Sequence, residues 1–199
     1  MTNCARLSAV ALATTLIIST HIRGEEFGRL PLRFEVNQGQ ADPKVRFLSR
    51  GRGLRLFLAG DEAVLAPDGR PDAAFRLRLA GASAAPEISG LDRLPGESHY
   101  LIGNDPRAWR THVPAYARVR YREVYPGIDL VFHGDQDVLE FDFEVAPGAD
   151  PGVIRMAFKG MDRLRLDLAG NLVIETAAGE IVQRAPVLYQ NVDGRRRPV

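Results

Sequence analysis

The chain has 199 residues, of which 45% are hydrophobic and 26% are charged, a composition typical of a globular protein that buries a core. Its 26 basic and 25 acidic side chains nearly cancel, so the overall charge gives no support for long-range attraction to nucleic acid or to an anionic membrane. The single cysteine, Cys4, excludes a disulfide framework within the chain.

The first element in chain order is an uncharged, apolar stretch at residues 7–20, preceded by Arg6. It is shorter than the roughly 20 residues that a membrane-spanning helix needs, and it suits the core of a secretory signal. We therefore expect a signal peptide-like segment at 1–24 and an exported, secreted or cell-surface domain at 25–199, with no membrane span after signal removal. Cys4 would leave with the signal, so no thiolate nucleophile or metal ligand would remain. The alternative is a buried helix of the domain, because the segment has no polar face.

From Leu30 onward, short alternating runs are separated by glycine, proline, aspartate or asparagine. Runs of strand length occur at 45–50, 54–58, 74–79, 99–102, 117–124, 128–132, 138–145, 154–158, 164–168, 172–176 and 180–184. The best helical signal is one turn at 105–109, where Asp105 can cap and Pro106 can take the first helical position. The pattern predicts an all-β, antiparallel sandwich-like domain with two lobes and at most one short helix besides the signal segment.

A softer stretch at 80–98 is rich in alanine, proline, glycine and serine. It could join the two lobes or form one long surface loop. We favour a single domain, because the first half alone has few strands with which to close a core.

The run at 138–145 alternates without interruption, which predicts one face toward the core and one toward water. The expected core face is Leu139, Phe141, Phe143 and Val145, and the expected water face is Glu140, Asp142 and Glu144, called here the acid row. Three carboxylates in a straight row cannot surround a calcium ion. Arginines of matching period at 118–122 and 163–165 could pair with them across strands, so we interpret the acid row as a solvated face crossed by arginines. A weak calcium site at Asp135 and Asp137 is the alternative.

No motif for metal hydrolysis, phosphate binding, dinucleotide binding or a nucleophile elbow occurs. Ser98 adjoins His99, but a catalytic triad is defined by spatial geometry and not by adjacency. The sequence therefore predicts no catalytic, cofactor-binding or metal-binding residue, and no cofactor. The amide cluster Asn37-Gln38-Gly39-Gln40 has two readings, a latch on exposed backbone groups or a polar site for a ligand such as a sugar, and the latch is favoured.

Three segments have a distinctive sequence: 32–51, 100–134 and 139–160. Their motifs include Gly103-Asn104-Asp105-Pro106, Trp109 and Tyr125-Pro126-Gly127-Ile128-Asp129. From about Leu30 to Val199 the chain resembles the N-terminal all-β domain of large bacterial exported or cell-surface proteins that carry SBBP repeats, which are thought to form β-propellers. The resemblance implies a non-enzymatic structural or interaction module that precedes propeller repeats and meets an unknown protein or carbohydrate ligand at the cell surface, with no nucleic-acid partner. The alternative is a carbohydrate- or peptide-processing enzyme that uses Asp and Glu side chains.

Relatives in that group continue past the last residues of this chain, so we expect a domain truncated at its C-terminal end. The arginines at 195–197 are then interpreted as a turn before a further strand, because three charges make a poor phosphate footprint. The apolar runs at 181–183 and 187–189 are expected to be the adhesive elements.

Overall fold

The computed structural model describes residues 10–18, 32–51, 53–135, 138–192 and 195–198, with the backbone alone described for 10–18, 135, 191–192 and 195–198. The described residues form an antiparallel all-β fold, which confirms the predicted fold class. The strands are β1 (Val10–Ile18), β2 (Phe34–Val36), β3 (Val45–Arg50), β4 (Leu54–Ala59), β5 (Glu62–Pro67), β6 (Phe75–Leu79), β7 (Glu87–Tyr100), β8 (Arg110–Tyr125), β9 (Ile128–Asp135), β10 (Val138–Val145), β11 (Met156–Lys159), β12 (Arg163–Leu166), β13 (Leu172–Thr176), β14 (Gly179–Gln183), β15 (Val187–Val192) and β16 (Arg195–Pro198).

Helical structure in the described part of the chain is limited to three 3-10 turns, η1 (Pro71–Ala73), η2 (Pro106–Ala108) and η3 (Pro151–Val153). The turn η2 is the one predicted at 105–109. The Asp105 carboxylate accepts a hydrogen bond from the backbone N–H of Arg107, and Pro106 supplies a fixed φ at the first position. Asp150 caps η3 in the same way.

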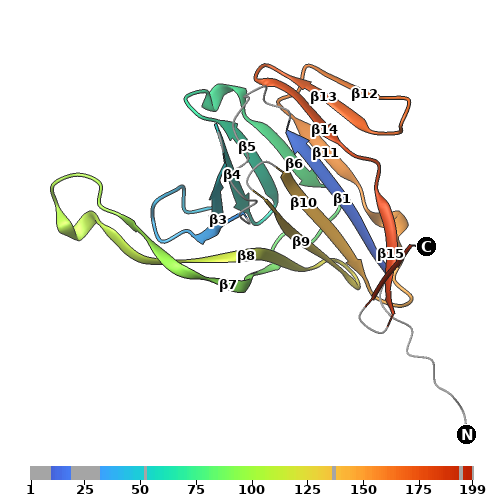
Figure 1. Cartoon of the computed structure of the whole chain (residues 1–199), viewed down its shortest axis with the longest axis horizontal. Helices are drawn as coiled ribbons and strands as arrows, with labels where there is room; N and C mark the ends of the chain where they lie inside the picture. The colour runs from blue at the N-terminus through green and yellow to red at the C-terminus, as the bar shows by residue number, and fades with distance from the viewer. Residues whose placement is uncertain (1–9, 19–31, 52, 136–137, 193–194, 199) are drawn as a thin grey trace, which may run out of the picture.

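The sheet divides at β8. Along one edge β8 pairs with β7, and along the other it pairs first with β2 (Phe34 opposite Tyr116) and then with β9 (Val119 opposite Phe132). Two wings therefore diverge from β8. The first wing runs β2-β3-β4-β5-β6-β11, and the second runs β9-β10-β1-β14-β13-β12 (Figure 1).

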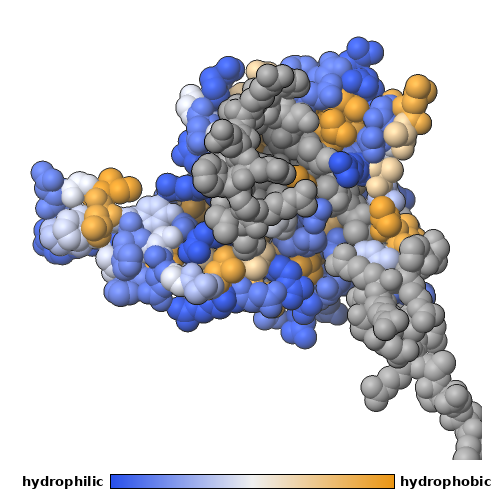
Figure 2. All heavy atoms as spheres, in the orientation of Figure 1, coloured by the Kyte–Doolittle hydropathy of each residue, from blue (hydrophilic) through white to orange (hydrophobic). Residues whose placement is uncertain are grey.

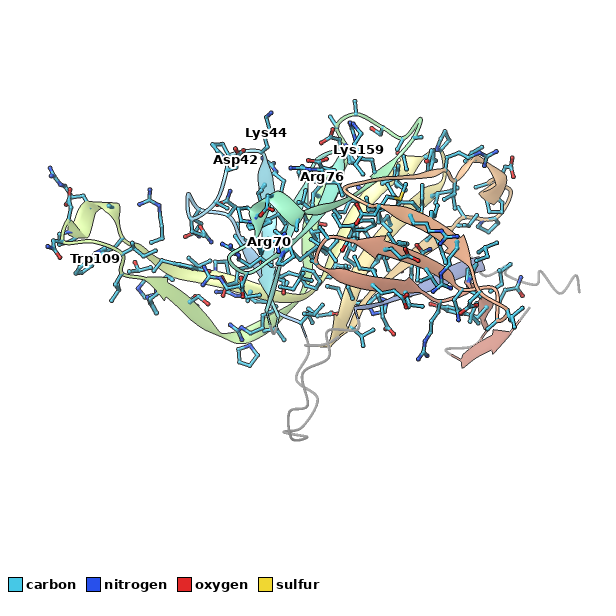
Figure 3. The ribbon with its side chains drawn as sticks, turned by 90° about the horizontal axis from the view of Figure 1, so that it is seen from above. Asp42, Lys44, Arg70, Arg76, Trp109 and Lys159 are labelled. Atoms are coloured by element: carbon cyan, nitrogen blue, oxygen red, sulfur yellow. The ribbon has the colours of Figure 1, made fainter. Side chains whose placement is uncertain are left out.

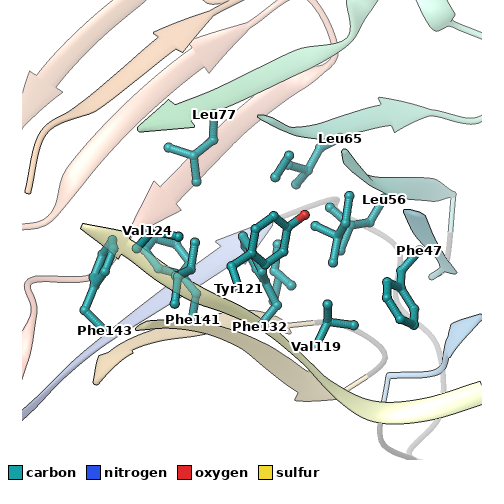
Figure 4. Packing of buried hydrophobic residues seen from close by; sticks show 14 of the residues in the cluster. Phe47, Leu56, Leu65, Leu77, Val119, Tyr121, Val124, Phe132, Phe141 and Phe143 are labelled. Carbon is teal, nitrogen blue, oxygen red and sulfur yellow. The ribbon is translucent and has the colours of Figure 1, made fainter. Parts of the chain in front are cut away.

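The hydrophobic core fills the space between the wings. Leu56, Leu65 and Leu77 of the first wing face Phe132 and Phe141 of the second (Figure 4). Ile174 of β13 and Ile181 of β14 join the same cluster, so the far end of the path curls back over the core. One core thus draws on residues from both halves of the chain, and each wing covers the other's apolar face.

The predicted loop at 80–98 is wrong for most of its length, because Glu87–Tyr100 forms β7. No side chain of β7 is buried, so the strand lacks the core-facing alternation by which strands are recognised. The strand predicted at 99–102 ends at Tyr100, and Leu101 and Ile102 lie beyond it.

The apolar segment near the N-terminus forms β1 at Val10–Ile18, between β10 on one side and β14 and β15 on the other. The alternative of a buried helix is therefore wrong for these residues; removal of the segment on export stays a prediction. Among the described residues, no helix is long and apolar enough to cross a membrane.

The C-terminal runs are paired more fully than expected. Ile181–Gln183 lies in β14, which has β13 and β1 on its two sides, so this run does not form an open edge. Val187 and Leu188 of β15 do expose their side chains, at 59% and 43%. Arg195–Pro198 forms β16, paired with β15, in place of the predicted turn.

Candidate interaction site

The most prominent feature of the surface is an arm formed by β7, β8 and their connecting tip at 101–109, which projects from the body of the molecule (Figure 1). β7 pairs only with β8, so its other edge is unpaired in the described chain. That edge is interrupted by Pro95, which lies within a register shift between Arg93 and Glu97, and by Asp92, which has a φ of 56°. Proline and bulges block the addition of a further strand, so we expect contacts at the end of the arm and not along its edge.

The tip has a defined structure. The indole Nε1 of Trp109 donates to the carbonyl oxygen of Gly103 at 3.1 Å, which ties the two ends of the turn together. Hydrogen bonds from Arg107 lower the pKa of Asp105, so the capping carboxylate stays charged in mildly acidic solution.

Two large apolar side chains lie exposed at this tip, Leu101 at 58% and Ile102 at 73%. Figure 2 shows an apolar patch near the end of the arm, surrounded by polar surface. An apolar pair on a structured protrusion is a feature of docking surfaces, whereas single exposed apolar residues are common everywhere.

The arm is held by a group of contacts that we call the latch. The Glu35 carboxylate on β2 accepts hydrogen bonds from the hydroxyls of Ser98 and Tyr100. Partial burial, together with the bond to Glu35, raises the pKa of Tyr100 to about 12, so the phenol remains a donor at neutral pH. The guanidinium of Arg50 lies 5.0 Å from the centre of the Tyr100 ring, a cation–π distance.

The amide cluster lies next to the latch, and its side chains hold the turn between β2 and β3. The Asn37 amide nitrogen donates to the carbonyl oxygens of Asp42 and Val45, at 2.8 and 2.9 Å, and Gln40 donates to that of Val36 at 2.7 Å. These bonds confirm that the cluster binds backbone groups, the favoured interpretation, because the side-chain amides of Asn37 and Gln40 are already engaged by them.

The turn that contains Gly39 contacts the arm through Arg110. Arg110 Nε donates to the carbonyl oxygen of Gln38 at 2.7 Å, so its guanidinium lies against this turn. Gly39 has a φ of 104°, and a Cβ atom there would lie 2.9 Å from Arg110 Nε. The backbone angle therefore requires glycine at this position, and an added Cβ atom would also displace the Arg110 guanidinium.

The core face predicted for β10 is confirmed, because Leu139, Phe141, Phe143 and Val145 are all at most 5% exposed. The prediction that Asp142 faces water is wrong. Asp142 is only 7% exposed, and the Tyr189 hydroxyl donates to its carboxylate at 2.9 Å.

Burial of Asp142 comes from the partners across the sheet. His133 Nε2 lies 3.3 Å from Asp142 Oδ2, which is within ion-pair distance, but its N–H is not aligned for a hydrogen bond. Glu140 is half-buried, with its carboxylate 3.3 Å from His133 Nδ1. The row is therefore not a uniform solvated face.

The arginine pairing is confirmed at one position of the acid row, where Arg120 Nη2 lies 3.0 Å from Glu144 Oε2. The neighbouring arginines pair elsewhere: Arg118 with Asp92, and Arg122 with Glu87, both on β7. Arg165 on β12 binds the carboxylates of Glu175 and Glu180, also away from the row. Arg118 and Arg122 therefore pair β8 with β7 within the arm, and Arg165 pairs β12 with β13 and β14.

Two histidines of the arm, which are 13 residues apart in the sequence, lie side by side in the structure. The His99 and His112 rings lie 5.0 Å apart, and His112 Nδ1 lies 2.8 Å from Glu97 Oε2. His112 has a φ of 58°, and this irregularity of the strand turns the ring toward its neighbour. Ser98 instead hydrogen-bonds Glu35, so it does not form a triad with His99.

The described part of the chain contains no group of three His, Cys, Asp or Glu side chains placed to hold a metal ion. The calcium alternative at Asp135 and Asp137 cannot be followed further, since the side chain of Asp135 and all of Asp137 lie outside the described residues.

Leu101 and Ile102 are the candidate functional residues that sequence reasoning assigned to a strand. The sequence did contain a signal for their exposure. The pair lies directly before the turn motif Gly103-Asn104-Asp105-Pro106, and side chains in a turn are exposed to solvent.

Comparisons with known proteins give one match. A family model described as a domain of unknown function (DUF7948) matches residues 34–199. No curated protein and no solved structure matches the chain. The family match spans β2 and every later strand, and the chain belongs to the DUF7948 family.

Proposed function

We propose that this domain is a non-enzymatic interaction module whose contact element is the tip of the arm. The observation that carries the proposal is the exposure of Leu101 and Ile102 on a tip that its own hydrogen bonds hold in one shape. The latch fixes the base of the arm, so little conformational freedom is lost when the tip binds.

The partner best suited to this tip is a protein surface with an apolar groove. Two apolar side chains on a narrow ribbon cannot present the roughly 1,200 Å² of buried surface that a stable flat interface needs, so the partner must enclose the ribbon from both sides. A carbohydrate fits less well, because the face of an accessible aromatic ring is the usual platform for sugar and Trp109 is half-buried with its indole N–H engaged.

The arrangement of carboxylates favours a binding module over a glycosidase or peptidase. An acid-catalysed hydrolase needs two carboxylates facing each other across a cleft, one of them with a raised pKa. The pKa of Asp92 is lowered by a hydrogen bond from Arg118, and the pKa of Glu97 is lowered by a hydrogen bond from His112. They are suited to ion pairing and not to proton donation at neutral pH.

The setting that we propose is the exterior of a bacterial cell. The apolar segment at 7–20 and the resemblance to domains that precede SBBP repeats support export and a neighbouring β-propeller, respectively. A propeller repeat of the same protein, with grooves between its blades, is the partner that we expect for the tip.

Site-specific photo-crosslinking tests the proposal. A photo-reactive amino acid in place of Ile102, in the natural full-length protein in its own cells, should give one discrete adduct mapping to a propeller repeat. The same group in place of Leu168, which is fully exposed on the turn after β12, is the matched control and should give none.

A second crosslinking experiment distinguishes mere proximity from an apolar contact. With the photo-reactive group at Asn104, the paired change Leu101→Ser and Ile102→Ser should abolish the adduct without lowering the melting temperature. An adduct of equal yield from position 168, or one that survives the serine pair, would contradict the proposal.

A further inference from the structure

A cavity of about 800 Å³ opens between the two wings, separate from the tip of the arm. Its floor consists of core side chains from β6, β8 and β9, among them Leu77, Tyr121, Leu130 and Phe132. Its walls are the loop at 80–86, β11 and the turn between β4 and β5. Small-molecule sites commonly have volumes of about 300–1,000 Å³ and apolar linings.

The floor offers little to a polar ligand. The Tyr121 hydroxyl, the polar group among these floor side chains, donates to the carbonyl oxygen of Ala59 at 2.8 Å. Burial raises the pKa of Tyr121, so the ring stays neutral. A sugar or a free amino acid would leave buried polar groups without partners there, whereas an alkyl chain would not.

The acidic side chains of the rim are neutralised by arginine. Asp61 pairs with Arg78, and Glu62 pairs with Arg76, each at 2.5 Å. They therefore add no net negative charge to the mouth of the cavity.

Three cations of the rim remain. Lys44, Arg46 and Lys159 are exposed, and none has an ion pair with another described residue. The carboxylate of Asp42 accepts a hydrogen bond from the backbone N–H of Lys44 at 2.8 Å. Lys44 and Lys159 point outward on the same side of the molecule (Figure 3). The mouth is thus positively charged above an apolar floor.

We propose that this cavity binds a single-chain amphiphile with an anionic head group, of the long-chain carboxylate class. The alkyl chain lies on the floor between the wings, and the head group lies among Lys44, Arg46 and Lys159. Charge complementarity selects the anionic head, and the lack of free polar groups on the floor selects the chain. This site does not depend on the proposed role of the arm.

Calorimetric titration with decanoate and with decyltrimethylammonium tests the proposal, because the two probes share a chain length and differ in head-group charge. Decanoate should bind saturably with a stoichiometry of one, and the cation should not. Affinity should rise about fourfold for each methylene added from octanoate to dodecanoate, all below their micellar concentrations.

Two variants with matched controls place the ligand. The triple change Lys44→Gln, Arg46→Gln and Lys159→Gln should weaken decanoate binding about tenfold, mostly at low salt. The control triple Arg33→Gln, Arg163→Gln and Arg184→Gln removes the same charge from exposed positions outside the lining and should leave affinity unchanged.

Filling the cavity gives the complementary result. Ser83→Trp, in the wall, should abolish binding, whereas Ala177→Trp on the turn between β13 and β14 should not. Both sites are exposed, and unchanged melting temperatures would show that both variants fold. No saturable decanoate binding, equal binding of the cationic probe, or equal weakening by the control triple would overturn the proposal.

Discussion

Gly90 of β7 lies under the ring of Tyr116, and replacing it by alanine should destabilise the base of the arm. A Cβ atom at position 90 would lie 2.4–2.7 Å from three atoms of the Tyr116 ring. Contacts this short do not occur, so the ring must move. Tyr116 also makes an edge contact with Phe47, at 6.0 Å between ring centres, and that contact would be lost.

The magnitude follows from three contributions. Overpacking costs about 1–3 kcal/mol, and loss of the aromatic edge contact costs about 0.5–1.5 kcal/mol. Alanine in a strand recovers about 0.5–1 kcal/mol relative to glycine, because the unfolded chain loses freedom. Gly90 does not have the left-handed backbone conformation, so no backbone strain is added. We expect Gly90→Ala to lower the free energy of unfolding by about 1–3 kcal/mol.

Equilibrium unfolding in urea, arranged as a double-mutant cycle, measures this effect. In a Tyr116→Ala background the clash disappears, and Gly90→Ala should become neutral or stabilising by up to about 1 kcal/mol. Gly60→Ala is the control, because position 60 has open space and no positive φ, and it should change stability by less than about 0.5 kcal/mol. Additive effects of Gly90→Ala and Tyr116→Ala would refute the packing argument.

Three further predictions concern the core and the latch. Tyr189→Phe should cost about 1.5–3 kcal/mol of unfolding free energy, because it removes a hydrogen bond to the buried carboxylate of Asp142. Phe141→Ala should cost about 3–5 kcal/mol, since the ring is 1% exposed in the core. The pKa of Tyr100, about 12, lies above its ordinary value of 10.0, so its contribution to stability is fully present below about pH 10 and is lost as the pH rises through about 12. Glu35→Gln should lower that pKa, which the ultraviolet absorbance of tyrosinate measures.

Matched substitutions control these predictions. Tyr116→Phe removes a hydroxyl that makes no hydrogen bond with the described residues, so it should cost much less than Tyr189→Phe. Glu144→Ala, on the partly exposed face of β10, should cost less than about 1 kcal/mol. Equal losses within either pair, or a tyrosinate titration unaffected by Glu35→Gln, would show that the assigned burial or the latch is incorrect.

The alternation of apolar and polar side chains was enough to predict the fold class and many of the strands. Val45–Arg50, Val138–Val145 and Leu172–Thr176 form strands with the predicted bounds. The strand at 138–145 has a buried face that repeats every second residue, whereas the strands at 45–50 and 172–176 bury consecutive residues. The turns at Asp105-Pro106 and Pro126-Gly127 were also predictable from local sequence, because proline fixes φ and glycine tolerates a positive φ; Gly127 adopts a φ of 70°.

The strands that the sequence concealed lack that buried face or hold small residues. All fourteen residues of β7 are exposed or half-buried, so its pairing with β8 is decided by backbone hydrogen bonds and ion pairs and not by alternation. β5, with two alanines and a terminal proline, has too weak an apolar signal to stand out, although Leu65 is 1% exposed.

Alternation predicts on which face of a strand a residue lies, and only the tertiary structure decides what covers that face. Asp142 lies opposite the core as expected, yet Tyr189 from a distant strand covers it and leaves it buried. The cavity is likewise a property of the two wings together, since its floor and its charged rim come from strands far apart in the chain. These features depend on contacts between residues of wide sequence separation, which local patterns do not encode.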